Sequence, residues 1–451
     1  MNRMKIALGL ALAAIACHPL NALAESYSSS APNTPKSPDW IMDAVIYQVY
    51  LRAFSPEGKF GSLENEIQRL KNLGVHCIEL LPVQPLASSA TDSMASPLDV
   101  KDLNAINLEC GTKDGFKSLI DQAHFEEMKV LLDWVCDRVS AESPMIKAHP
   151  DWFLPAEAGG KTIPLDYRSR ELRKFVQDSL LNWVNDYGLD GFHFLGAGAL
   201  PADFAREIRA EISRHKPGFV LFADTAAFPA SSFHAVEEDD FYRAVSSVTL
   251  AQVPVSRIET ALVGAAKQTD VWPVPVRFIE NFATPRAARL LGDGAITAAA
   301  LLLTSDGVPL IYSGQEIAET RQPSLVNREP IDWAKGLKSH SETRKIYKKL
   351  IAFRGKHPAL RKGQRFPVPV AASPQIFAFA ASYREDLILA VFNFSPSEFN
   401  GRIDLPDIFI SEKGKIQLKA FFDGRGELKQ TGADSADLRL VPWGFQVWEM
   451  K

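Results

Sequence analysis

The chain has 451 residues, of which 46% are hydrophobic and 23% are charged. This length exceeds one ordinary domain but suits a large barrel with a smaller partner domain, and the composition is that of a globular protein. The formal net charge of −4 gives no indication of nucleic acid or of an anionic membrane surface as a partner.

The first 24 residues have the features of an export signal. Arg3 and Lys5 precede a short apolar run, Ile6–Cys17, which is too short to span a bilayer. Ala22-Leu23-Ala24 fits an A-x-A cleavage site and predicts a mature start near residue 25. We therefore expect an exported protein, periplasmic or extracellular. Acylation of Cys17, as in a lipoprotein, is the alternative.

The residues after this signal predict a disordered leader over 25–39, because Ser, Pro and Ala dominate there. Cleavage leaves Cys77, Cys110 and Cys136, an odd number without CxxC spacing, so neither a disulfide framework nor a cysteine metal site is expected. Cys77 and Cys136 lie in apolar runs and are expected as buried free thiols. We expect no later segment to cross a membrane.

From Trp40 onward, short apolar runs alternate with longer amphipathic stretches, which is the pattern of parallel βαβ units. Their number predicts an α/β fold, a closed (β/α)₈ TIM barrel over residues 40–366. The sixth strand is poorly marked and is expected near Asp240–Val245. The other strands are expected at Ala44–Tyr50, His76–Leu81, Val130–Val135, Gly191–Leu195, Val220–Ala223, Val276–Glu280 and Val308–Tyr312, and helices at Leu63–Leu73, Lys113–Glu127, Ser169–Tyr187 and Pro201–His215.

A change of pattern near Pro367 predicts a second domain. Strand-like runs separated by turn residues, without a convincing helix, are typical of a small antiparallel β-sandwich, here over residues 367–451. The expected strands are Ile376–Tyr383, Leu387–Phe394, Ile416–Phe422 and Gln446–Glu449.

The most specific motif is Gly188-Leu189-Asp190-Gly191-Phe192-His193-Phe194-Leu195. It resembles the fourth-strand signature of the α-amylase family, glycoside hydrolase family 13, which reads G-(V/L)-D-G-F-R-x-D and ends on the catalytic nucleophile. Other segments are similar to further motifs of the family and occur along the chain in the family's order. They are Ala44–Phe54, Lys71–Val83, Gly307–Glu316 and Pro442–Phe445. The resemblance covers nearly all of the chain after Trp40 and implies a TIM barrel, a short loop subdomain after the third strand and a C-terminal antiparallel β domain.

The chain departs from this pattern at the catalytic positions. The resemblance places the nucleophile at Leu195, the third carboxylate at Ala283 and the general acid, usually Glu, at Asp224. Glycosidases need two carboxyls, about 5–5.5 Å apart for retention or about 6.5–9.5 Å apart for inversion. Only Asp224 remains, so we expect no intact catalytic set.

Two other acids are candidates for a relocated second carboxylate, Glu280 and Asp190. Alternation along the seventh strand puts Glu280 on the face opposite Ala283. Asp190 is typically a structural acid in the D-G-F frame.

The resemblance also gives positions for sugar binding. Asp133 matches the first acid of the third-strand motif D-x-V-x-N-H, but Asp137 replaces the Asn that supports calcium. Arg138 replaces the substrate-binding His, and Leu98 replaces a Tyr that stacks on the sugar. Phe282 replaces a seventh-strand His. The expected substrate-binding residues are Asp133, Trp134, Arg138, His193, Asn281 and Phe282, with Trp152, Phe153 and Phe194 as further aromatic candidates.

No cofactor is expected, and a calcium ion is the alternative that stays open. The calcium-supporting loop that the resemblance implies, Asp137–Leu165, is short. It carries Glu142, Asp151 and Glu157 but no dense acidic cluster of the kind that holds calcium.

Three functional classes remain. We favour an exported, catalytically inactive relative of α-amylases that binds an α-glucan, such as a maltooligosaccharide, or a protein partner. The second class is an active α-glucan hydrolase or transglycosylase that uses Asp224 and a relocated carboxylate. The third is an interaction domain whose barrel mouth is filled by apolar side chains.

Overall fold

The computed structural model describes residues 37–87, 97–157, 159–225, 232–264, 273–324, 328–370, 373–410, 417–422, 425–432 and 434–450. The expected export signal, the lipoprotein cysteine and nearly all of the leader lie outside these residues.

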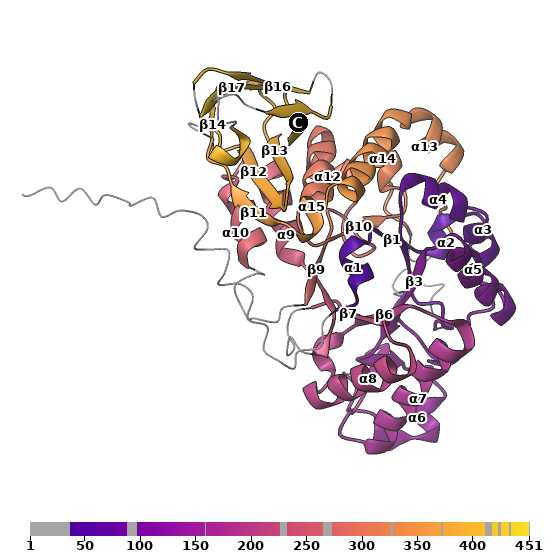
Figure 1. Ribbon diagram of the computed structural model, residues 1–451. Coiled ribbons are helices and arrows are strands. Elements are labelled where there is room, and N and C mark those ends of the chain that lie inside the picture. The colour runs from indigo at the N-terminus through magenta and orange to yellow at the C-terminus, as the bar shows by residue number, and fades with distance from the viewer. Residues whose placement is uncertain are drawn as a thin grey trace, which may run out of the picture. The chain divides into compact units, whose positions relative to one another are not determined.

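The fold is organised around a closed barrel of parallel strands in the order β1-β10-β9-β8-β7-β6-β3-β2 (Figure 1). This confirms the TIM barrel predicted from the alternation of strands and helices. The strands are short and almost wholly buried, as helix-covered parallel strands are. They are β1 (Ile46–Val49), β2 (Cys77–Leu80), β3 (Lys129–Val135), β6 (Gly191–Leu195), β7 (Val220–Ala223), β8 (Ala235–Glu237), β9 (Val274–Arg277) and β10 (Val308–Tyr312).

Two predicted strand positions are wrong. The sixth barrel strand is β8, whereas Asp240–Val245 lies within helix α9. The buried residues of α9 include Phe241, Ala244, Val245 and Val248, at the spacing of three and four that marks a helix. The seventh strand, β9, ends at Arg277, so Glu280 belongs to the following loop and strand alternation does not govern where its side chain lies.

The barrel interior consists of an apolar layer and a polar layer nearer the carboxyl ends of the strands. Ile46, Cys77 and Leu131 belong to one buried apolar cluster. Residues two positions further on in the same strands are Gln48, Glu79 and Asp133, all fully buried. Because residues i and i+2 of a strand share a face, the polar layer lies directly between the apolar layer and the barrel mouth.

Helices surround this barrel, and several of their ends follow local sequence signals. The side chain of Ser169 accepts a hydrogen bond from Leu172 N at the start of α7, and Gly188 ends that helix in the left-handed conformation. The helices are α1 (Asp39–Asp43), α2 (Leu51–Phe54), α3 (Phe60–Glu64), α4 (Ile67–Leu73), α5 (Lys113–Phe125), α6 (Met145–Ala148), α7 (Arg170–Tyr187), α8 (Ala202–His215), α9 (Asp239–Ala251), α10 (Ser256–Gly264), α11 (Ala287–Leu291), α12 (Ala295–Thr304), α13 (Trp333–Ser339), α14 (Ser341–Lys356) and α15 (Ala359–Lys362).

The loop after β3 carries a small two-stranded sheet, and two antiparallel sheets follow the barrel. The small sheet pairs β4 (Arg138–Ser140) with β5 (Thr162–Pro164). One C-terminal sheet has the order β11-β12-β13-β18-β15 and the other β14-β17-β16, with a shared apolar core. Their strands are β11 (Gln364–Pro367), β12 (Ile376–Tyr383), β13 (Asp386–Asn393), β14 (Phe399–Asp404), β15 (Leu418–Ala420), β16 (Gly426–Gln430), β17 (Ser435–Leu440) and β18 (Phe445–Met450).

Among the described residues, one stretch has the length and apolar composition to cross a membrane, Ala287–Thr304. Within the structure 61% of it is buried, and α12 contacts both α14 and β13. Core helices of barrels have this composition because they are covered on most sides. The three thiols, Cys77, Cys110 and Cys136, are free and buried, which confirms that expectation for Cys77 and Cys136.

Candidate active site at the barrel mouth

Leu195, at the nucleophile position, ends β6 and is 5% exposed within the main hydrophobic core. Its carbonyl oxygen accepts hydrogen bonds from Cys136 N at 3.0 Å and from Cys136 Sγ at 3.1 Å. An alkyl side chain packed in this way supplies neither a nucleophile nor a proton. The end of the fourth barrel strand is therefore a packing position in this protein.

Asp224 follows β7, and both of its carboxylate oxygens bind the backbone. Oδ2 accepts from Gly196 N at 2.7 Å, and Oδ1 accepts from Ala197 N at 3.1 Å. Gly196 has φ +81°, and a Cβ added there would lie 2.4 Å from the Asp137 carboxyl carbon. A glycine is therefore required at this turn. Asp224 acts here as a clamp on the turn after β6.

Asp137 and Arg138, which follow β3, pair with each other. Arg138 donates to Asp137 Oδ2 at 2.6 Å. Burial raises the pKa of Asp137 in spite of the Arg138 charge, and the neighbouring charge of Asp224 adds to the rise. The guanidinium that stands at the substrate-binding position is thus held beside a carboxylate.

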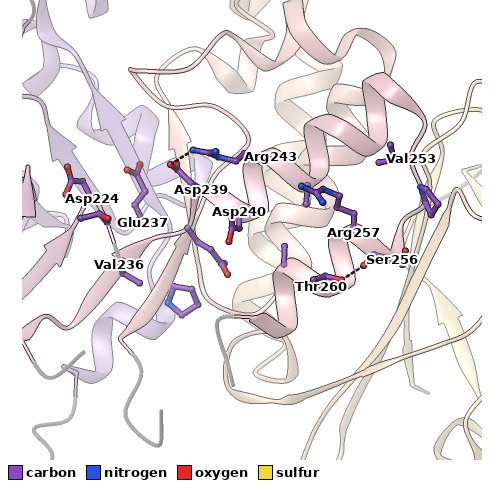
Figure 2. A pocket seen from close by; sticks show the side chains of 16 residues that line it. Asp224, Val236, Glu237, Asp239, Asp240, Arg243, Val253, Ser256, Arg257 and Thr260 are labelled. Carbon is purple, nitrogen blue, oxygen red and sulfur yellow. Dashed lines mark hydrogen bonds and ion pairs between the residues drawn. The ribbon is translucent and has the colours of Figure 1, made fainter. Parts of the chain in front are cut away.

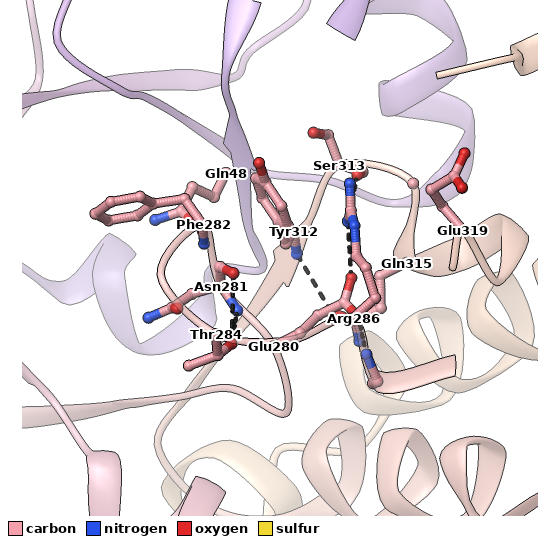
Figure 3. A network of polar contacts seen from close by, with 12 residues as sticks. Gln48, Glu280, Asn281, Phe282, Thr284, Arg286, Tyr312, Ser313, Gln315 and Glu319 are labelled. Atoms are coloured by element: carbon pink, nitrogen blue, oxygen red, sulfur yellow. Dashed lines mark hydrogen bonds and ion pairs between the residues drawn. The ribbon is translucent and has the colours of Figure 1, made fainter. Parts of the chain in front are cut away.

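The loop after β9 is closed by its own hydrogen bonds. Ala283 N donates to Asn281 Oδ1 at 3.0 Å, and Asn281 N donates to Thr284 Oγ1 at 2.8 Å. Ala283 is exposed and has no functional group to offer. Phe282 N donates to the Gln48 side chain at 2.8 Å, so this loop is tied to β1 (Figure 3).

Apolar side chains gather where β1, β2 and β10 end. Tyr50, Leu81 and Tyr312 form a buried cluster with Ala53, and Phe282 packs against it. Phe282 thus contributes an apolar surface where the resemblance implies a sugar-binding His.

Glu280 is buried and fully engaged, so it is not a free second carboxylate. Its Oε1 accepts from Arg286 at 3.0 Å, and Oε2 accepts from Ala287 N (Figure 3). Arg286 also donates to Ser313 O at 2.9 Å and lies over the Tyr312 ring. This network fastens the loop after β9 to the loop after β10.

Asp190 lies just before β6, at the amino end of the strand and away from the mouth. It accepts from His124 at 2.6 Å and from Val130 N at 3.0 Å, and it pairs with Lys129 and Lys216. Burial alone would raise its pKa, but the His124 hydrogen bond and the Lys216 charge lower it to about 2. The structural role expected for Asp190 fits these contacts.

Asp133 and His193, two expected sugar-binding residues, are 0% exposed in the polar layer of the barrel. Trp134 is also fully buried and packs edge-on against Trp183 and Phe192, so it presents no face to a ligand. Leu98 packs against the main core. Of the expected binding residues, Arg138, Asn281 and Phe282 lie at the mouth, and Asp133, Trp134 and His193 are inside the fold.

A cavity of about 710 Å³ lies beside the mouth, where β7 and β8 end against α9 and α10 (Figure 2). Asp224 and Glu237 line it from the strand side, and Arg243 and Arg257 from the helices. Its further lining residues include Glu238, Asp239, Asp240, Val253, Pro254 and Thr260.

Glu237 is a candidate functional residue that the sequence analysis did not identify. It ends β8, and Asn281 Nδ2 donates to its Oε1 at 2.8 Å. Burial raises the pKa of Glu237 to about 7, although the charge of His193 opposes this. The carboxyl end of a barrel strand is a catalytic position in this fold, so a correct assignment of the sixth strand would have revealed Glu237.

Comparisons with known proteins agree with this architecture. The model of the α-amylase catalytic domain family matches residues 24–152. The α-amylase MalA of Haloarcula japonica is 25% identical over 393 residues, which are 79% of this chain and 56% of that protein. The chain therefore spans little more than half the length of that relative.

Solved α-amylase structures share the fold over almost their full length. A noncanonic maltogenic α-amylase, AmyB, from Thermotoga neapolitana superimposes with a TM-score of 0.81 at 23% identity, covering 91% of this chain and 99% of that one. An α-amylase from Geobacillus thermoleovorans, solved in complex with acarbose, gives a TM-score of 0.79 at 19% identity and the same coverage.

Proposed function

This chain belongs to the α-amylase family. We propose that it is an exported protein that has lost glycoside hydrolysis and binds α-glucan chains. The inactivity is supported chiefly by the contacts of Asp224, the only acid left at the three catalytic positions of the family. Both of its oxygens accept backbone hydrogen bonds from the turn after β6. A carboxyl held in this way is poorly placed to protonate a leaving oxygen.

The proposal of binding is supported by the cavity beside the mouth. Its volume of about 710 Å³ lies in the range of small-molecule sites. The carboxylates of Asp224 and Glu237, the guanidinium of Arg257 and an Arg243–Asp239 ion pair line it, and such groups bind sugar hydroxyls by hydrogen bonds (Figure 2). The acarbose complex of the Geobacillus relative makes a maltooligosaccharide the first ligand to test.

One observation favours a second candidate, a relocated hydrolase. Glu237, with its pKa raised to about 7, and Asp224 line the same cavity. A neutral acid beside a carboxylate is the arrangement that glycoside hydrolysis uses. This candidate requires Asp224 to break its hydrogen bonds with Gly196 N and Ala197 N when a substrate binds.

Hydrolysis assays separate the two candidates. The full chain is incubated with starch, maltodextrins and an activated α-glucoside, next to the variants Asp224→Asn and Glu237→Gln. We expect the same product release as in blanks without protein for all three proteins. Turnover that is lost in both variants would establish the hydrolase and contradict the proposed inactivity.

Affinity electrophoresis in gels containing amylose, and calorimetric titration with maltoheptaose, test binding. The variants Arg243→Ala and Arg257→Ala should lose retardation, whereas Arg214→Ala on α8, an exposed arginine away from the cavity, should keep it. Equal migration of all proteins with and without glucan would refute glucan binding and favour the interaction domain or a protein partner.

Export is tested separately by fractionating cells that express the full chain and determining the N-terminus of the product. We expect a soluble exported protein that begins near residue 25. A product acylated at Cys17 would establish the lipoprotein alternative, and an intact N-terminus inside the cell would refute export.

A further inference from the structure

The polar layer inside the barrel contains three ionisable side chains from neighbouring strands. Glu79 comes from β2, Asp133 from β3 and His193 from β6. Asp133 and His193 are register partners on adjacent strands, and all three residues are 0% exposed. The His193 ring stacks on Phe222 with 4.0 Å between centroids, which fixes the plane of the imidazole.

The distances in this cluster match a coordination shell, although the contact of His193 with Asp133 is also within hydrogen-bonding distance. His193 Nδ1 lies 3.3 Å from Glu79 Oε1 and 3.3 Å from Asp133 Oδ1. Charge-assisted hydrogen bonds between nitrogen and oxygen are usually about 2.7–2.9 Å long. In a tetrahedral zinc site with bonds of about 2.0–2.1 Å, by contrast, adjacent ligand atoms are roughly 3.3 Å apart.

The same cluster contains buried polar atoms that lack a partner. Within the described part of the chain, Glu79 Oε2, Asp133 Oδ2 and His193 Nε2 make no hydrogen bond. Buried carboxylates without compensation are costly, and such groups are paired or coordinate metals. A cation held by both carboxylates would give Glu79 Oε2 and Asp133 Oδ2 a positive neighbour, whereas His193 Nε2, across the ring from Nδ1, is not accounted for by it.

Charge balance favours a divalent ion as that cation. Two carboxylates and a neutral imidazole carry a charge of −2, which one divalent cation cancels completely.

A second layer of contacts orients one of the ligands. Gln48 Nε2 donates to Glu79 Oε1 at 2.7 Å, while Gln48 Oε1 accepts from Phe282 N at 2.8 Å. The amide is thereby fixed between the loop after β9 and the carboxylate. Outer hydrogen bonds of this kind hold metal ligands in place.

We propose that Glu79, Asp133 and His193 form a binding site for one divalent first-row transition ion, such as Zn²⁺, inside the barrel. Its ligand atoms all lie within 4.8 Å of one another. The ion would be structural, because the site is closed on all sides and has no access for a substrate. The site shares no residue with the cavity beside the mouth and was not expected from the sequence.

The test is metal analysis of the full chain after expression in medium supplemented with Zn²⁺ and purification without chelators. Inductively coupled plasma mass spectrometry of zinc, manganese, iron, cobalt and nickel should find about one ion per chain. Removing that ion with a strong chelator should lower the thermal unfolding midpoint, since a ligand that binds only the folded state stabilises it.

Three variants decide whether the ion is at this site. His193→Arg and Asp133→Asn should each purify without the ion. The thermal midpoint of His193→Arg should not change when the chelator is added, because its guanidinium supplies a permanent positive charge between the two carboxylates. His215→Ala, which removes a half-exposed histidine from α8, should keep the ion. A wild-type chain without any transition ion, or an ion kept by both His193→Arg and Asp133→Asn, would overturn the proposal.

Discussion

The clamp formed by Asp224 can be tested by its contribution to stability, in the variants Asp224→Ala and Asp224→Asn. The alanine variant leaves the N–H groups of Gly196 and Ala197 without their acceptors. Hydrogen bonds to charged groups contribute about 1.5–3 kcal/mol each. The carboxylate is half-buried, so water can satisfy part of the exposed N–H groups in the variant. We therefore expect the alanine variant to lose about 2 kcal/mol in free energy of unfolding.

Asparagine keeps one acceptor oxygen but turns an NH₂ group toward the other N–H, so we expect about half that loss. In a domain of this size, 2 kcal/mol corresponds to roughly 3 °C in the thermal midpoint. Differential scanning fluorimetry at pH 7 measures it, with Asp240→Asn, an exposed carboxylate on the same cavity, as the control. The clamp would be refuted if the alanine variant had the thermal midpoint of the wild type, or if the alanine and asparagine variants had the same midpoint.

Three further predictions concern the buried charges and Leu195. Arg286→Met leaves Glu280 buried without its ion-pair partner and should lower the free energy of unfolding by about 3–5 kcal/mol. The thermal midpoint should fall well below that of the wild type, and an unchanged midpoint would contradict the network in Figure 3. The folded-state pKa of Asp190, lowered from 3.8 to about 2, gives stability that is present above pH 4 and is lost as the pH falls toward 2. Asp190→Asn should therefore lower stability by about 2 kcal/mol at pH 7 and by almost nothing at pH 2, so an equal loss at both pH values in thermal melts would exclude a charge effect. Leu195→Asp should lower stability, because an unpaired carboxylate replaces a core side chain. It should give no starch hydrolysis, because Ala283 supplies no third acid. Turnover in this single variant would show that the rest of the site is intact.

Much of the barrel could be predicted from the sequence because its strands are short apolar runs bounded by turn residues. Gly191–Leu195, Val220–Ala223 and Val308–Tyr312 coincide with β6, β7 and β10. The strand β8 could not be found in this way, because its three residues Ala235–Glu237 carry no periodicity and the apolar residues of α9 follow at once.

In the C-terminal domain four of the five strands of the larger sheet were predicted, whereas β11 and the strands of the smaller sheet were not. β16 (Gly426–Gln430) and β17 (Ser435–Leu440) contain many exposed polar residues. One face of such a sheet meets water, so its sequence lacks a continuous apolar run. Short solvated strands of this kind are recognised only from their pairing partners.

For the site, the family resemblance could assign residues to positions but could not show what those residues contact. The family position of Asp224 was evident, whereas its two backbone partners depend on the left-handed turn at Gly196. Similarly, Asp133 and His193 were assigned to sugar binding by position, and their complete burial depends on neighbouring strands, such as β7, whose Phe222 stacks on the His193 ring.

The Asp224 clamp also bears on how this protein can evolve. Any substitution that frees the carboxylate from Gly196 and Ala197 removes two hydrogen bonds from the turn after β6. A new role for Asp224 is therefore coupled to a loss of fold stability, and it requires a compensating stabilisation elsewhere in the barrel.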